Sequence, residues 1–548
     1  MFHGDTIQKR YLKMVHGAIE SGWREANRLF SDNRNPPFGQ LPKKPQKCSV
    51  VIIGAGMAGL GAARELVAAG INDIVILEAQ ERAGGRVCTA PLENGHIELG
   101  AQWIHGEDNP IYHIAHKQNL LSNTTSAEGL GPYLKTDGTE LCSSLVAHVS
   151  HKISGILEDC EQFVACDENY PSSVGQYLRD RFQEYLETCS DDTPEERQTK
   201  WSIFEWHLRF QEIDNSCSDL DSLSAKHWGK YKFTGGEDYI NLLSGYSSVV
   251  DALIQDLPDH IIHFNSPVKK IVWQKKLSAM NSNQLSDDFA SFPSCVLCED
   301  GSIVHSMHVI VTCSIGYLKA NLDFMFEPTL PSSLTSAIDS MGFGVVDKVF
   351  LVYDTPWWGE EQQAFQIVRG HLNEVNTAEE RDWWLKDCTG FDVLSRDPPI
   401  LLAWVGGEGA VFMERLSEDD IAEHCTSLLQ KCVPKLNIPL PKYIKRSCWS
   451  SNVYIRGGYS HTTVDRDQTS CGRKDLTIPV YCEMESAQKH PVILLAGEAA
   501  HESHYSTAHG AFESGQSQAR ALIKYQKETK SRLTELYSAN NVDASGVK

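Results

Sequence analysis

The sequence lacks the features that would anchor it in a membrane or mark it for secretion. No apolar run reaches the roughly 20 residues of a membrane-spanning helix, and the longest one, residues 50–70, contains Arg64 and Glu65. Residues 1–40 are polar and charged, without the apolar core of a signal peptide. The C-terminal Gly546-Val547-Lys548 does not match a Ser-Lys-Leu peroxisomal address. We therefore expect a soluble, cytoplasmic protein without a membrane partner.

Basic residues are outnumbered. The chain has 50 lysines and arginines against 72 aspartates and glutamates, which gives a net charge of −22. A surface of this sign repels nucleic acids and concentrates cationic ligands. We expect no nucleic-acid partner.

The sixteen cysteines do not form a disulfide framework by their spacing, because they are scattered over 548 residues. Free thiols in a reducing compartment are the simpler interpretation. The one CxxC motif, Cys295 and Cys298, has no second Cys/His pair nearby, and residues three apart on a strand face opposite sides. We predict that it binds no metal.

The clearest folding unit begins at Ser49, in a chain long enough for two or more domains. Its parts are a β-branched strand at 49–53, the motif Gly54-x-Gly56-x-x-Gly59, a small-residue helix at 57–69, and a strand at 74–77 that ends at Glu78. Gly54 permits a tight turn, Gly56 lets the backbone approach a pyrophosphate, and Gly59 lets the helix pack on the strand. Glu78 is placed to accept hydrogen bonds from ribose hydroxyls. The unit predicts dinucleotide binding.

Later segments alternate in the same way. The expected strands are 268–273, 304–312 and 492–496, and the expected helices are 247–256 and 509–524. Residues 278–291 are predicted to be a surface loop, and the segment after Gln526 a polar, disordered tail.

These patterns predict an α/β fold with a discontinuous Rossmann-like domain and an α+β substrate-binding domain. The expected division gives residues 48–130, 240–330 and 470–525 to the first domain, 131–239 and 331–469 to the second, 1–47 to an N-terminal extension and 526–548 to the tail.

One motif occurs twice. His16-Gly17-Ala18-Ile19-Glu20-Ser21-Gly22 matches His509-Gly510-Ala511-Phe512-Glu513-Ser514-Gly515 at all but one position. Nothing precedes the early copy that it could complete. We interpret it as the remnant of a tandem copy, from gene duplication or a fused transcript; a chance helical similarity is the alternative.

A second set of motifs distinguishes FAD from NAD. Gly84-Gly85-Arg86 follows Glu78, and the block Gly100-Ala101-Gln102-Trp103-Ile104-His105-Gly106 comes next. A nicotinamide enzyme has no need of them, whereas a flavoprotein uses such a glycine pair and cation against the extended cofactor.

These blocks, together with residues 496–501 and 505–511, resemble the flavin-containing monoamine and polyamine oxidase family, and the similarity extends over about residues 48–524. The resemblance implies that Glu498 binds the ribityl or phosphate region of FAD and that the helix after Thr507 covers the isoalloxazine. The implied FAD-binding residues are Gly54, Gly56, Gly59, Glu78, Gly84, Gly85, Arg86, Gly100, Ala101, Gln102, Trp103, Val268, Glu498, Thr507 and Ala508.

Three positions narrow the resemblance. Gly458 stands before Tyr459 where monoamine oxidases carry the cysteine that attaches FAD, so the flavin is expected to be noncovalent. Thr507 replaces an aromatic wall of the monoamine oxidase cage, which suits a flexible aliphatic amine. The block around His105 is similar to animal spermine and acetylpolyamine oxidases, whose histidine lies beside the substrate.

The resemblance also implies the reacting groups. Lys348 matches the lysine that holds a water against flavin N5, although a lysine between valines is more often at the edge of a sheet. His105, which could instead be a core histidine, would orient or deprotonate the amine, and Tyr459 would flank the reacting carbon. His105, Tyr459, Thr507 and Glu212 are the expected substrate contacts, with Asp214 beside Glu212; a solvated charge cluster is the alternative for these two acids.

His501, His504 and His509 cluster in sequence, but no carboxylate or cysteine completes a metal site with them. We expect no metal.

The resemblance as a whole implies oxidation of a secondary amine in spermine or an N1-acetylated polyamine. The products would be an aldehyde, a shorter polyamine and, with O2, hydrogen peroxide. A monoamine oxidase, a histone-lysine demethylase and an inactive FAD-binding scaffold are the alternatives.

Overall fold

The first strand of the chain lies at the centre of a large sheet. The computed structural model describes residues 46–125, 128–273, 292–369, 381–469, 471–483 and 489–543. The predicted loop at 278–291 and the early copy of the repeated motif lie outside these residues.

Strand β1 is buried on both faces. Val51 and Ile53 pack into one hydrophobic cluster and Val50 and Ile52 into another, as expected for a strand with helices or further sheet on both sides. β1 pairs in parallel with β2 and with β11. The nine strands of this sheet are β1 (Gln46–Ile53), β2 (Ile74–Leu77), β8 (Ile262–His263), β9 (Val268–Trp273), β10 (Ser294–Cys298), β11 (Ile303–Val311), β12 (Phe326–Glu327), β20 (Val480–Glu483) and β21 (Lys489–Leu495).

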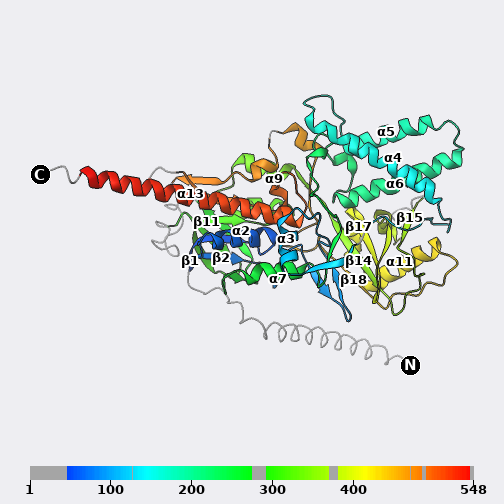
Figure 1. Ribbon diagram of the computed structural model, residues 1–548, viewed down its shortest axis with the longest axis horizontal. Coiled ribbons are helices and arrows are strands. Elements are labelled where there is room, and N and C mark those ends of the chain that lie inside the picture. Colours follow the sequence, from blue (N-terminus) through cyan, green and yellow to red (C-terminus); the bar gives the residue numbers. More distant parts are fainter. Residues whose placement is uncertain are drawn as a thin grey trace, which may run out of the picture.

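Helices from both ends of the chain cover this sheet (Figure 1). Helix α2 (Met57–Ala68) follows the glycine motif, and α13 (Ala508–Asp543) packs against it. The two approach closely at Gly515, where an added Cβ would lie 1.9 Å from the carbonyl oxygen of Ala58. The other helices beside the sheet are α3 (Pro110–Lys117), α7 (Ser247–Gln255), α8 (Ile315–Met325), α9 (Ser332–Ser340) and α12 (Arg473–Leu476).

A second, six-stranded sheet lies at the other end of the molecule (Figure 1). Its strands run in the order β18–β14–β17–β16–β15–β6, and all neighbours are antiparallel except β15 and β6. They are β6 (Tyr133–Lys135), β14 (Val346–Val352), β15 (Ala364–Val368), β16 (Gly390–Arg396), β17 (Pro399–Gly406) and β18 (Tyr443–Arg446). The fold class expected from the sequence is confirmed.

Five further helices surround the second sheet. They are α4 (Ser143–Cys160), α5 (Val174–Thr188), α6 (Pro194–Asp214), α10 (Gly407–Met413) and α11 (Glu418–Cys432). Helix α6 begins at a capping box, because the Thr193 hydroxyl accepts from the Glu196 amide and the Glu196 carboxylate accepts from the Thr193 amide. The short paired strands are β3 (Thr89–Pro91) with β4 (His96–Glu98), β5 (Leu121–Thr125) with β7 (Ile240–Leu242), and β13 (Met341–Phe343) with β19 (Ser460–Thr462).

The prediction of a disordered tail after Gln526 is wrong over most of its length. Helix α13 continues to Asp543 and extends beyond the body of the protein in Figure 1. Neither proline nor glycine occurs between Gly515 and Gly546, and good helix formers such as Lys, Glu, Leu and Arg fill this stretch. Polarity alone therefore did not distinguish a solvated helix from a coil.

All sixteen cysteines lie in the described part of the chain, and each is a free thiol. No described helix combines the length and apolar character that crossing a bilayer requires.

Candidate active site

A cavity of about 730 Å³ runs between the two sheets and is lined by residues from nearly every predicted motif. Of the predicted site residues, only Gly59 and Glu212 do not line it. The cavity walls include Gly54, Gly56, Glu78, Gly84, Gly85, Arg86, Gly100, Ala101, Gln102, Trp103, His105, Val268, Lys348, Tyr459, Glu498, Thr507 and Ala508.

One end of the cavity fits a dinucleotide. No described side chain caps the N-terminus of α2, and its first residues, Met57 and Ala58, line the cavity, so free amide groups there can meet phosphate. Glu78 is buried, and its carboxylate is fixed by the amides of Ala55 (2.7 Å) and Gln80 (2.8 Å).

Gly59 does not line the cavity but lies behind the turn at Gly54. A Cβ on Gly59 would lie 1.9 Å from the carbonyl oxygen of Gly54. Helix α2 can therefore pack on the turn only if this residue is glycine, which is the role that its place in the motif predicts.

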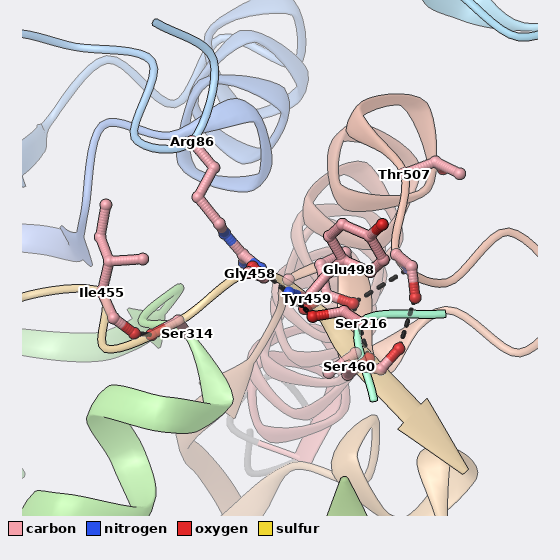
Figure 2. A network of polar contacts seen from close by, with 12 residues as sticks. Arg86, Ser216, Ser314, Ile455, Gly458, Tyr459, Ser460, Glu498 and Thr507 are labelled. Carbon is pink, nitrogen blue, oxygen red and sulfur yellow. Dashed lines mark hydrogen bonds and ion pairs between the residues drawn. The ribbon is translucent and has the colours of Figure 1, made fainter. Parts of the chain in front are cut away.

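The C-terminal motif meets the N-terminal one at Glu498, which is 4% exposed. Arg86 donates to the Glu498 carboxylate at 3.0 Å and to the carbonyl oxygen of Gly458 at 2.7 Å. Ser460 Oγ and the Ser506 amide donate to the other carboxylate oxygen at 2.6 and 3.0 Å. Figure 2 shows Arg86 extending between these segments.

The charge of Glu498 is stabilised by this network. Burial raises the pKa of Glu498, but the guanidinium of Arg86 and the hydroxyl of Ser460 outweigh it, so the net pKa is lowered. The ionised carboxylate thus joins segments about 40 and 410 residues apart.

Lys348 lies on an interior strand of the six-stranded sheet. Strand β14 lies between β17 and β18, so Lys348 is not at a sheet edge, and it is 2% exposed. Side chains alternate along a strand, so Lys348 shares the face of Phe350 and Val352, which packs on Ile97.

The Lys348 ammonium has three protein acceptors. Nζ donates to the carbonyl oxygens of Glu98 (2.9 Å) and Gly100 (2.8 Å) and to Gln102 Oε1 (2.7 Å). It also lies 4.3 Å from the ring centroid of Trp404. Burial lowers its pKa to about 7, so the group titrates near neutral pH.

His105 and Tyr459 line the same part of the cavity. The His105 ring lies 6.5 Å from Trp103 and 6.2 Å from Tyr239, and burial lowers the pKa of its imidazole. The Tyr459 hydroxyl donates to the carbonyl oxygens of Ile213 (3.0 Å) and Asp214 (3.2 Å). Because this hydroxyl is engaged, the aromatic ring is the group that Tyr459 offers to a ligand.

The Thr507 side chain makes hydrogen bonds within the protein at the start of α13. Its hydroxyl donates to the carbonyl oxygen of His504 at 2.7 Å and accepts from the Gly510 amide at 2.9 Å. The side chain therefore caps the first turn of α13, and its hydroxyl is not free for a ligand.

Three carboxyl groups outside the glycine and flavin motifs line the cavity: Glu128, Asp214 and Asp392. Glu128 lies near Lys348, and Asp214 and Asp392 lie near Glu128. Burial, together with the nearby Asp214 and Asp392, raises the pKa of Glu128 to about 8. Burial raises the pKa of Asp392 to about 7. Asp214 is exposed and lines the cavity, and desolvation by the surrounding protein raises its pKa to about 6.

Glu212 does not reach the cavity, whereas Asp214 does. Two residues apart on α6, the two side chains point to opposite sides of the helix. Glu212 lies instead near Arg209 and Asp387. The neighbouring aspartate is thus the acid that the structure brings to the site.

The expectation that no carboxylate accompanies His501 and His504 is wrong. Glu513 of α13 lies 3.2 Å from His501 Nε2 and 3.0 Å from His504 Nδ1. His501 Nδ1 accepts from the amides of Ser503 (3.3 Å) and His504 (2.8 Å), so in its neutral form the proton is on Nε2 and is donated to Glu513. A metal ion at His501 would need a lone pair on Nε2, where the neutral ring carries its proton. The cluster is therefore better described as a set of hydrogen bonds that joins residues 501–504 to α13.

Comparison with known proteins identifies related chains. A family model described as flavin containing amine oxidoreductase matches residues 57–523. A peroxisomal N(1)-acetyl-spermine/spermidine oxidase of Bos taurus is 32% identical over 86% of this chain and 94% of its own. A human protein of the same name is 30% identical over 88% and 96%. The probable polyamine oxidase 5 of Arabidopsis thaliana is 28% identical over 88% and 99%.

Solved structures support the fold. A triple variant of putrescine oxidase with redesigned cofactor binding superposes with a TM-score of 0.61 at 20% identity, over 88% of this chain and all of that one.

Proposed function

The chain belongs to the family of flavin containing amine oxidoreductases and uses FAD, and from this premise we propose that it oxidises a secondary amine of a linear polyamine such as spermine or an N1-acetylated polyamine. The observation that carries the proposal is the group of carboxyls, Glu128, Asp214 and Asp392, in the wall of the cavity. A cationic aliphatic chain is the ligand whose charge such a wall stabilises.

The FAD site would be formed by Gly54, Glu78, Arg86 and the start of α13, with Gly59 behind the turn. When bound, FAD supplies the acceptor for a hydride from the carbon beside the amine and passes the electrons to O2, which gives hydrogen peroxide. Hydrolysis of the oxidised amine would then give an aldehyde and a shorter polyamine.

The protein's own part is to position the substrate and control its protons. Because the pKa of His105 is lowered, its imidazole is neutral at pH 7 and can accept a proton from the reacting ammonium. The ring of Tyr459 would flank the reacting carbon, and an aromatic face also attracts an ammonium by about 0.5–2 kcal/mol. The three donors of the Lys348 ammonium are taken by Glu98, Gly100 and Gln102, so it would be the lone pair of the neutral amine that holds a water near the reacting position.

The proposal is tested by adding spermine or N1-acetylspermine to the purified holoenzyme, following hydrogen peroxide in air and flavin bleaching in the absence of oxygen. Bleaching by either polyamine is expected, with benzylamine as the arylalkylamine comparison. Faster bleaching by benzylamine would favour a monoamine oxidase, and no bleaching by any amine would favour an inactive scaffold.

The binding of a diamine should tighten as pH rises from 6 to 8.5. The carboxyls with pKa values of about 6, 7 and 8 are neutral below these values and ionised above them, while an alkylammonium, with a pKa of about 10, stays charged. We expect the Kd of 1,12-diaminododecane, measured by calorimetry on the reduced holoenzyme, to fall about tenfold over this range.

Binding should also release protons, which calorimetry in buffers of different ionisation enthalpy detects. Asp392→Asn keeps the acceptor for Gln366 Nε2, now 3.1 Å from Asp392 Oδ1, and should weaken the pH dependence. A Kd independent of pH would remove these carboxyls from the ligand site.

A further inference from the structure

The cavity is bordered by a short segment, residues 231–236, which we call the strap. At one end the Lys232 amide donates to the carbonyl oxygen of Ser503 at 3.0 Å, in the turn before α13. At the other end Thr234 Oγ1 donates to the carbonyl oxygen of His105 at 2.5 Å, and the Glu107 amide donates to that of Gly235 at 2.6 Å. The strap is therefore tied to both the flavin motif and the segment that carries His105.

Alternate side chains of the strap face the cavity. Tyr231 and Phe233 line it, whereas the ammonium of Lys232 between them donates to the carbonyl oxygen of Gly229 at 2.9 Å. This alternation is that of extended chain. Phe233 is 74% exposed although it lines the cavity, which places it at the opening.

The aromatic rings continue inward from Phe233. The Phe233 and Tyr231 centroids are 5.1 Å apart, and those of Tyr231 and Tyr505 are 5.5 Å apart. All three rings line the cavity. Neighbouring nitrogens of an extended polyamine are about 5 Å apart across three methylenes and about 6 Å across four, at the advance per bond of an extended chain. The distance between the Phe233 and Tyr231 rings thus matches the spacing of neighbouring charges, whereas the Tyr505 ring already has the Arg473 guanidinium 3.8 Å from its centroid.

Acidic groups also line the cavity beside the chain just before the strap, where an added Cβ on Gly229 would lie 3.0 Å from the Cβ of Glu161. Glu158 of α4 and Glu161, just after it, are exposed and line the cavity. Trp228 Nε1 donates to the carbonyl oxygen of Leu157 at 3.1 Å, which holds the chain before the strap against α4. An ammonium at this position would have carboxylates and aromatic faces near it, and its methylenes would cover the exposed ring of Phe233.

We infer that the strap forms an outer subsite for the distal part of a long linear polyamine, with Phe233 as the residue that sets the preference for length. The inference rests on the proposed function for the identity of the ligand. It implies that a chain long enough to pass the strap gains affinity at Phe233, while a short diamine held at the inner carboxyls does not.

The test compares two ligands of equal charge, 1,12-diaminododecane and 1,4-diaminobutane. Their binding is measured by calorimetry on dithionite-reduced, anaerobic holoenzyme, in which no amine is oxidised. Phe233→Leu should raise the Kd of the long diamine about fivefold, as expected for loss of one aromatic face, and change that of the short diamine less than about twofold. Phe233→Tyr should restore the wild-type preference.

Phe324→Leu is the matched control, because Phe324 is 72% exposed on α8 and does not line the cavity. Equal effects of Phe233→Leu on both diamines, or none on either, would overturn the inference. So would an equal effect of Phe324→Leu. Failure of the proposed function would instead appear as wild-type flavin that no polyamine bleaches, a result that this binding measurement does not depend on.

Discussion

Glu498→Gln is expected to yield protein that is purified largely without FAD. The substitution leaves the Arg86 guanidinium without its anionic partner and removes an acceptor for Ser460 Oγ and the Ser506 amide. Breaking a buried ion pair by removing one partner costs about 3–5 kcal/mol. Because the Arg86 side chain is 27% exposed, we expect a cost at the lower end of this range, about 3 kcal/mol. A loss of this size in the free energy of FAD binding lowers the affinity about a hundredfold.

The ratio of flavin to protein absorbance after gel filtration, and the Kd from titration with added FAD, measure this loss. Glu65→Gln is the matched control, since Glu65 of α2 pairs with Arg520 of α13 and so also joins the two ends of the chain. The Arg520 side chain is 61% exposed, and an exposed pair is worth about 1 kcal/mol at most. Full flavin content in both variants would contradict the role assigned to Glu498.

Lys348→Met is expected to slow flavin reduction or reoxidation by about a hundredfold while FAD remains bound. Methionine keeps most of the side-chain length but offers neither a proton nor a charge beside the inner cavity. The pKa of Lys348 is lowered to about 7, so the neutral amine prevails above this pH and the ammonium below it. The wild-type rate at saturating spermine should therefore change near pH 7, and the variant should lack the part of this change that Lys348 causes, while Asp392 and Glu128 still titrate in both proteins.

Stopped-flow absorbance with spermine over pH 6–9 measures both half-reactions. Lys445→Met is the control, because Lys445 lies on β18 beside Phe350 of β14 but is exposed. Unchanged rates would mean that Lys348 takes no part in flavin reduction or reoxidation and acts only through its three hydrogen bonds to residues 98–102. Loss of FAD instead of slow reduction would show that these hydrogen bonds hold residues 98–102 in the position that FAD binding requires.

The sequence alone could not distinguish Glu212 from Asp214 as the acid that lines the cavity. The sequence places Glu212 and Asp214 together, but the helical repeat of α6 sends them to opposite sides. Glu128 and Asp392 are far from both in the chain and approach Asp214 only because α6 packs beside the six-stranded sheet.

The same distinction applies to Lys348. A lysine among valines is compatible with an exposed edge or with a buried centre of a sheet, because the pattern of one strand does not specify its neighbours. The pairing of β14 with β17 and β18 decides for the centre. That position buries the ammonium and lowers its pKa.

The motifs expected to bind FAD could be recognised in the sequence alone. Phosphate recognition depends on a strand, a glycine turn and a helix that are contiguous in the chain, so Gly54 to Glu78 could be interpreted locally, and the family motifs added Arg86 and Glu498. Only the folded chain shows which acids line the cavity, that Glu513 joins His501 and His504, and that Phe233 is an exposed residue of the cavity wall. These features depend on contacts between distant segments, and the packing of helices and sheets determines them.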